Sequence, residues 1–303
     1  MTTEPPRSKT LIVTAWVFLL LASGLARIIL QEVFGYEVSL NLSSLIAAIV
    51  ILIGLIMTFL WSDIRELRQF FILFMVLVAA EWFVYTEMDQ LSFYQAWLNN
   101  PSFSVYLLGE QSLRLMVTLV LIAVLFMIKK KREAFFLIKG DTNAEAKPVQ
   151  WLGIRPGERW SHLGRNFAFI LSLGTLAFLV FAGRPPLDIA SRALPFLPFV
   201  FIAAVLNAFN EEMTYKASFL SVLENVVGKH QALLLMAAYF GIGHFYGVPY
   251  GVIGVLMAGF LGWFLGKSML ETRGLFWAWL IHFVQDVLIF AFLAIGSIVP
   301  GGG

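Results

Sequence analysis

Long apolar runs are the feature that most constrains how this chain can fold. Nine such runs are separated by short polar segments, and each approaches the length that crosses the roughly 30 Å hydrocarbon core of a bilayer as a helix. The runs lie near residues 11–30, 41–61, 70–86, 112–128, 166–183, 196–222, 231–248, 250–270 and 274–297. A backbone in lipid must satisfy its own hydrogen bonds, so the runs predict an all-α polytopic membrane protein with about nine transmembrane helices, eight being possible.

Composition excludes several classes of protein. Hydrophobic residues make up 59% of the 303 residues and charged residues only 13%, about half of the roughly 25% found in an average soluble domain. The chain has no cysteine, which excludes disulfides, thiolate catalysis and cysteine-ligated metal sites. The net charge of +2 does not indicate a nucleic-acid partner, so the expected environment is the lipid bilayer.

The distribution of Lys and Arg predicts an orientation, because cytoplasmic loops carry the excess of basic residues. With a cytoplasmic N-terminus and nine alternating spans, 16 of the 21 basic residues fall on the inner side. They are Arg7, Lys9, Arg65, Arg68, Lys129, Lys130, Lys131, Arg132, Lys139, Lys147, Arg155, Arg159, Arg165, Lys229, Lys267 and Arg273. We therefore expect a multi-pass protein of the cytoplasmic membrane with its N-terminus in the cytoplasm.

A hydrophilic stretch divides the chain into two membrane regions. Residues 129–165 open with four consecutive basic residues and predict a cytoplasmic basic loop. Residues 11–128 would then form an N-terminal region of four helices and residues 166–297 a C-terminal region of five. Residues 1–10, with two consecutive prolines, are expected to be a disordered tail.

Ionisable residues inside membrane spans are costly and therefore indicate function. The sixth run contains Glu211, Glu212 and Lys216. Glu212 and Lys216 are four residues apart and share a helix face, in the order that favours an ion pair. Glu211 points about 100° away and has no partner on its own helix. We predict a structural ion pair between Glu212 and Lys216 and a catalytic role for Glu211.

Two histidines lie in the apolar runs that follow. His244 comes after Phe240, and the glycines between them, Gly241 and Gly243, allow another helix or a substrate to approach closely. His282 and Asp286 are again four residues apart, so the carboxylate can orient the imidazole. The Glu pair, His244 or the His282–Asp286 pair alone would be explained by helix packing. Because all of them occur together on three helices, they indicate a functional site.

The spacing of these groups resembles a known family. Glu211-Glu212-Met213-Thr214-Tyr215-Lys216, Phe240 to His244, and His282-Phe283-Val284-Gln285-Asp286 are similar in order and spacing to three motifs of the CPBP family. This family comprises CAAX prenyl endopeptidases and bacteriocin-processing (Abi) proteins. The likeness covers roughly residues 166–297, and it implies that this region is a CPBP-like catalytic membrane domain. Its implied activity is hydrolysis of a peptide bond in a peptide, or in a lipidated or membrane-anchored protein.

Two positions depart from the usual family pattern. Lys216 stands where the family usually has Arg; Lys keeps the charge but loses the planar, bidentate fork of a guanidinium. Asp286 stands where the family usually has Asn. Asp is an accepted alternative at this position, but an ionised Asp cannot donate a hydrogen bond to an oxyanion.

The resemblance leaves two mechanisms open. In the first, Glu211, His244 and His282 hold zinc, which polarises the carbonyl and activates water. In the second, no metal takes part, and Glu211 with His244 removes a proton from water while His282 and Asp286 stabilise the oxyanion. We favour the second mechanism.

Two further expectations concern geometry. Glu81 in the third run is expected to pair with Arg114 or Arg27 near the outer margin. With straight helices, Glu211 and His244 would lie toward opposite membrane faces. Because the two must meet for catalysis, the sixth helix is expected to extend past residue 222, or one of the two helices to be broken or tilted.

Two other functions are compatible with the same residues. A non-enzymatic immunity or scaffold protein would bind a hydrophobic peptide in the same chamber, and a proton-coupled transporter would use the ionisable groups as a relay. A transporter would favour internal symmetry, and residues 11–128 and 166–297 show none.

Overall fold

The fold is described from a computed structural model that covers residues 8–298 apart from 89, 101, 130 and 185–186. These residues form α-helices joined by short 3₁₀ and π segments, and no β-strand occurs among them. The prediction of an all-α polytopic membrane protein is confirmed.

Within the described part of the chain, seven helical segments are long and apolar enough to cross a membrane. They are Leu40–Leu60 (α3), Ser62–Met88 (containing α4, Arg68–Phe83), Phe103–Lys129 (α6), Trp160–Phe181 (within α7, Trp160–Gly183), Ser191–Leu223 (containing α8, Leu197–Glu211), Val252–Thr272 (α11) and Phe276–Gly296 (α12). An eighth span arises if Lys9–Ala22 (α1) and Leu25–Val33, which meet at a 51° bend, cross together.

The predicted count of about nine spans is therefore approximate. The segment that falls short is α10 (Lys229–Gly243), which has 15 residues. At 1.5 Å per residue such a helix is about 22 Å long, less than the hydrocarbon core.

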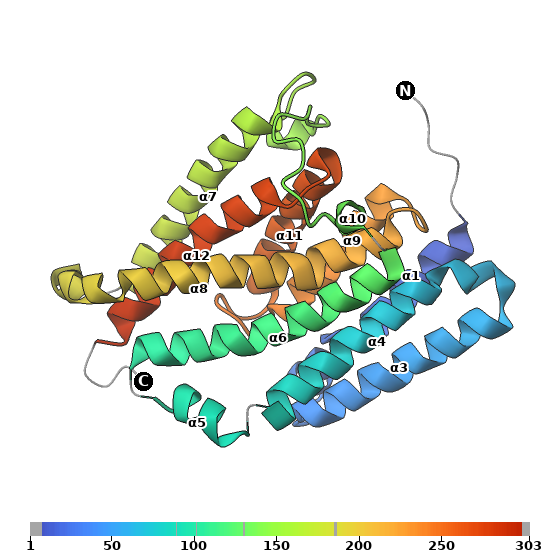
Figure 1. The fold of residues 1–303 in the computed structure, drawn as a ribbon, viewed down its shortest axis with the longest axis horizontal. Coiled ribbons are helices and arrows are strands. Elements are labelled where there is room, and N and C mark those ends of the chain that lie inside the picture. Colours follow the sequence, from blue (N-terminus) through green and yellow to red (C-terminus); the bar gives the residue numbers. More distant parts are fainter. Residues whose placement is uncertain (1–7, 89, 101, 130, 185–186, 299–303) are drawn as a thin grey trace.

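The N-terminal helices pack together on one side of the molecule and the C-terminal helices on the other, with α6 and α8 side by side between them (Figure 1). Aromatic side chains join the two sides, because Phe219 of α9 (Ser218–Leu223) contacts Phe70 and Phe74 of α4 edge to face. Phe219 also stacks on Tyr239 of α10. This cluster of aromatic rings fixes α9 and α10 against the N-terminal helices.

The helical segment that carries the Glu pair is long and irregular. It runs from Ser191 to Leu223, 33 residues, or about 50 Å, so it crosses the bilayer tilted or projects beyond it. Between α8 and α9 it contains a π-helical turn, Glu212–Ala217 (η7). The segment thus ends only one residue past position 222, and the irregularity of the sixth helix is the π-turn that interrupts it.

Glycines let α10 and α11 approach each other closely, as the sequence indicated. A Cβ on Gly241 would lie 2.7 Å from the carbonyl oxygen of Val255 and 3.0 Å from Cα of Gly259. A Cβ on Gly262 would lie 2.9 Å from the Phe240 ring. Gly241 thus serves the packing of α10 against α11, whereas a Cβ on Gly243 would meet nothing within 4 Å.

The segment between α6 and α7 is folded onto the ends of α11 and α12. Trp160 Nε1 donates to Glu271 at 2.9 Å, and Lys267 Nζ donates to the carbonyl of Lys147 at 2.9 Å. Trp277 of α12 donates to the carbonyl of Thr142 at 2.9 Å.

At the N-terminus, α1 begins at Lys9. The predicted tail of residues 1–10 is therefore too long by two residues, and residues 1–7 lie outside the described part.

Candidate active site

The two adjacent glutamates lie where α8 passes into the π-helical turn. Glu211 is the last residue of α8 and Glu212 the first of η7. Both carboxylates are buried, Glu212 completely. A π-turn widens the helix locally and is common at functional sites. As adjacent residues of a helix, the two glutamates point into different surroundings.

Glu212 is held by two cationic or donor groups. Its Oε1 lies 2.8 Å from Lys216 Nζ and 2.7 Å from His282 Nδ1. Lys216 is also fully buried, and its Nζ lies 3.6 Å from the centre of the Phe240 ring. The charge of Glu212 is thus compensated within the protein, and the side chain connects α12 to the π-turn.

The contact with Glu212 fixes the orientation of the His282 ring. An ionised carboxylate can only accept, so Nδ1 carries the hydrogen of this bond. Nε2 then lies 3.6 Å from Glu211 Oε2 and 3.6 Å from Asp286 Oδ1. His282 therefore places one nitrogen between two further carboxylates.

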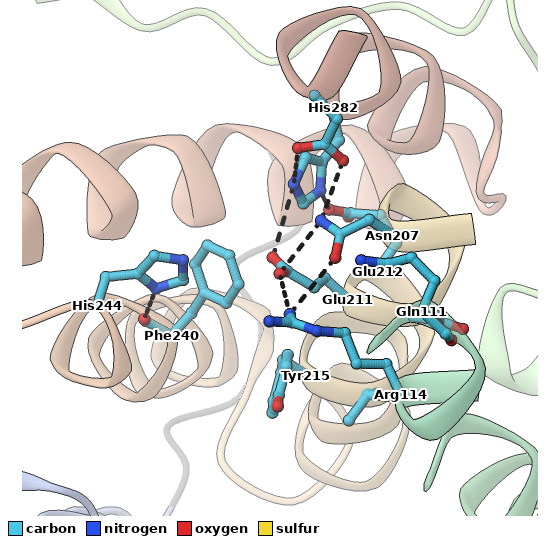
Figure 2. A network of polar contacts seen from close by, with 12 residues as sticks. Gln111, Arg114, Asn207, Glu211, Glu212, Tyr215, Phe240, His244 and His282 are labelled. Atoms are coloured by element: carbon cyan, nitrogen blue, oxygen red, sulfur yellow. Dashed lines mark hydrogen bonds and ion pairs between the residues drawn. The ribbon is translucent and has the colours of Figure 1, made fainter. Parts of the chain in front are cut away.

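Glu211 is contacted by two donors that come from different helices. Its Oε1 accepts from Arg114 Nη1 of α6 at 3.1 Å and from Asn207 Nδ2, one turn earlier on α8, at 3.3 Å. Asn207 Nδ2 also lies 3.1 Å from Asp286 Oδ2. Figure 2 shows Arg114, Asn207, Glu211 and His282 in this one network.

His244 lies apart from that network. Its Nδ1 is 2.8 Å from the carbonyl oxygen of Phe240, and its ring packs on the Phe240 ring at a centroid distance of 4.4 Å (Figure 2). Because a carbonyl only accepts, Nδ1 is the donor and Nε2 remains available. No hydrogen bond or ion pair among the described residues joins His244 to Glu211 or His282.

A cavity of about 830 Å³ is lined by Glu211, His244, His282 and Asp286 together. Its lining is mainly apolar and includes Leu171, Phe178, Met257, Phe260 and Ile289. Its polar lining residues are Gln111, Arg114, Thr175, Asn207, Glu211, His244, His282, Gln285 and Asp286. An apolar cavity of this size with a few polar groups is typical of a site for a hydrophobic ligand.

The loop that follows His244 borders the same cavity. Val248 and Pro249 line it, and the neighbouring tyrosines contact the N-terminal helices. The Arg27 guanidinium lies 5.0 Å above the Tyr246 ring. A hydrogen bond to Glu32 raises the pKa of Tyr250 to about 12. These contacts hold the loop against the segment Leu25–Val33.

The residues present do not fit the zinc site that the sequence left open. Within the described part of the chain, no group of three or more His, Asp or Glu side chains is arranged to hold a metal ion. Of the three expected ligands, His244 makes no hydrogen bond or ion pair with Glu211 or His282 among the described residues, and the Arg114 guanidinium, a cation, occupies Glu211 Oε1. We therefore derive no step of the reaction through a metal.

The structure brings together Glu211, Glu212, Lys216, His282 and Asp286, and places His244 on the same cavity. Two further residues of the site, Arg114 and Asn207, were not predicted from the sequence. A basic residue inside the apolar run 112–128 was the available signal for Arg114.

One predicted ion pair is wrong. Glu81 accepts a hydrogen bond from Tyr215 Oη at 2.6 Å instead of pairing with an arginine. Arg114 pairs with Glu211, and Arg27 Nε donates to Gln31 at 2.5 Å. The correction follows from the partners that the fold supplies: Tyr215 of η7 donates to Glu81, and the guanidinium of Arg114 is bound to Glu211.

The fold and the site together define a polytopic helical membrane protein with a buried carboxylate–imidazole centre beside an apolar cavity. Residues 193–288 match the family described as type II CAAX prenyl endopeptidase Rce1-like. The chain thus carries an Rce1-like domain, which confirms the resemblance to the CPBP family. The domain includes Glu211, His244, His282 and Asp286, whereas Arg114 lies outside it.

This family points to a CAAX-protease-like intramembrane endopeptidase, with a peptide or protein in the membrane as its substrate. A search of curated proteins found no match, and neither did a search of solved structures.

Proposed function

We propose that this protein is an intramembrane endopeptidase in which Glu211 activates water for attack on a peptide bond. The observation that carries the proposal is the position of Glu211. Its carboxylate borders the 830 Å³ cavity and is the only one of the adjacent glutamates to do so; Glu212 is fully buried and bound to Lys216 and His282.

In the proposed reaction, the water oxygen attacks the scissile carbonyl carbon while its proton passes to Glu211. The carbonyl π bond opens to give a tetrahedral oxyanion. When that intermediate collapses, the C–N bond breaks and Glu211 returns the proton to the leaving nitrogen, which leaves a free acid and a free amine. Proton transfer by a positioned side chain typically contributes about 10²–10⁴-fold to the rate.

His282 is proposed to stabilise the oxyanion. Glu212 holds Nδ1, so the ring keeps a fixed orientation and Nε2 lies at the cavity. In its protonated form His282 presents the Nε2 hydrogen to the carbonyl oxygen. Asp286, 3.6 Å from Nε2, supports that charge. Donors held in place before the reaction contribute more than donors that must reorganise.

His244 is proposed to hold the attacking water together with Glu211. Its Nδ1 hydrogen is committed to the Phe240 carbonyl, so Nε2 can accept a hydrogen bond from water or substrate. The apolar lining of the cavity supports a substrate whose segment beside the scissile bond is hydrophobic or lipidated.

The test is cleavage of fluorogenic peptides, with and without lipid groups, by the purified protein. We expect cleavage by the wild type that persists in chelator, and its loss in Glu211→Gln. Loss of wild-type cleavage in chelator would contradict the metal-free mechanism. Tight binding of a peptide without cleavage, unchanged in Glu211→Gln, would instead indicate a binding protein.

We further propose that the N-terminus is cytoplasmic and that the segment after α6 lies in the cytoplasm. The absence of native cysteine makes single-cysteine labelling unambiguous. An impermeant maleimide added to intact cells should label Ser92→Cys and not Lys131→Cys, both of which are exposed positions. The reverse pattern would invert the topology.

A further inference from the structure

A polar face of α6 contacts the helix that carries the catalytic glutamate. Gln111, Arg114 and Thr118 are spaced by three and four residues and therefore share one side of α6. Thr118 Oγ1 lies 3.1 Å from Asn210 Oδ1, and Asn210 Nδ2 donates to the carbonyl of Gln111 at 3.3 Å. These bonds fix the register of α6 against α8.

Arg114 is the charged member of that face. Its Nη1 donates to Glu211 Oε1 at 3.1 Å and lies 3.4 Å from Asn207 Oδ1. The side chain is 40% exposed and lines the apolar cavity. An arginine within a membrane span is costly on insertion scales, by about 2.5–3.5 kcal/mol, so a contact with the catalytic carboxylate indicates a role beyond packing.

We propose that Arg114, supplied by the N-terminal membrane region from outside the Rce1-like domain, is a positioning residue for Glu211. Its guanidinium binds Oε1 and so leaves Oε2 directed toward His282, 3.6 Å away. The proposal rests on the function proposed above for Glu211. It makes the active site composite: α6 completes a centre whose other groups lie on α8, η7 and α12 and, for His244, at the residue that follows α10.

A merely structural role is distinguishable. Packing of α6 against α8 is provided by Thr118, Asn210 and Gln111 without the guanidinium. If Arg114 only packed, its loss would lower stability and leave turnover of the folded protein unchanged. If it bound the substrate instead of Glu211, its loss would raise KM and leave kcat unchanged.

The test compares Arg114→Gln and Arg114→Lys with wild type and with Arg68→Gln in the full-length purified protein. Arg68 is the matched control, because it is a partly buried arginine of the N-terminal region whose guanidinium contacts Thr58 and Phe59 at a distance from the site. Folding is checked by the thermal midpoint and elution volume, and peptide cleavage by kcat and KM.

We expect Arg114→Gln to lower kcat about 100-fold, as for a misplaced catalytic group, with KM changed by less than about threefold. Arg114→Lys should recover at least about tenfold of the loss, and Arg68→Gln should stay within about twofold of wild type. Where Arg114→Gln does not fold, the kcat of Arg114→Lys decides, and it should lie about tenfold below wild type.

Two results would overturn the inference while leaving the protease intact. The first is that the wild type cleaves the peptide and the folded Arg114 variants cleave it with the same kcat. The second is a rise in KM alone. Failure of the wild type to cleave any peptide would remove the proposed function, and the inference with it.

Discussion

The buried contact between Glu212 and Lys216 allows a quantitative prediction for Glu212→Ala. Both side chains are completely buried, and the carboxylate lies 2.8 Å from Nζ. Removing it leaves an ammonium group without a counter-ion in an apolar interior. Breaking a buried pair in this way costs about 3–5 kcal/mol. The same change removes the acceptor of His282 Nδ1.

Removing both charges should separate stability from activity. Glu212→Ala with Lys216→Met replaces the pair by apolar groups, and its free energy of unfolding should lie within about 1–2 kcal/mol of wild type. Its activity should stay low, because His282 lacks its acceptor. Glu212→Gln with Lys216→Met restores an acceptor for Nδ1 and should recover both stability and activity.

The assay is equilibrium unfolding in mixed micelles with a denaturing detergent, followed by the fluorescence of the nine tryptophans, together with peptide cleavage. A Glu212→Ala protein as stable as wild type would refute the assignment of Glu212 to a structural ion pair. Equal activity of the two double variants would refute the role of Glu212 in orienting His282.

Three further predictions concern single positions. Asp286→Asn, which keeps the contact to Asn207, should retain cleavage within about tenfold of wild type, whereas Asp286→Ala should lose about 100-fold; equal losses would exclude a role for the polar side chain. Gly241→Leu should destabilise the protein by about 1–3 kcal/mol, because its Cβ alone would approach the α11 backbone to 2.7 Å. The control Gly174→Leu should be neutral in the same unfolding assay, because nothing lies within 4 Å of a Cβ at that position. Ala258→Trp, which narrows the cavity, should raise KM for lipidated peptides at least about tenfold. The control Ile253→Trp, at a position 62% exposed, should leave KM unchanged. Equal KM values for the two variants would place the substrate outside this cavity.

Contacts within one helix were predictable from the sequence. The spacing of four residues placed Glu212 beside Lys216 and His282 beside Asp286, and the structure shows both pairs, at 2.8 and 3.6 Å. Helical periodicity fixes such neighbours wherever the helix lies. The positions of the apolar runs likewise predicted the helices, although α10 proved too short to count as a span.

Contacts between helices were not predictable in the same way. The bond between Glu212 and His282 joins residues 70 positions apart, and that between Arg114 and Glu211 joins residues 97 apart. Which helices become neighbours depends on packing, such as the close approach of α10 and α11 at Gly241. For this reason Glu81 was assigned an arginine partner, whereas the fold gives it Tyr215.

In the proposed division of roles, Glu211 performs the chemistry while Glu212 holds the site together. Single-turnover cleavage of one peptide substrate by wild type and by Glu211→Gln tests this division, with the thermal midpoint measured on the same samples. We expect Glu211→Gln to fold with an unchanged midpoint and to cleave at least about 10³-fold more slowly. Cleavage within about tenfold of wild type by folded Glu211→Gln would contradict this division of roles.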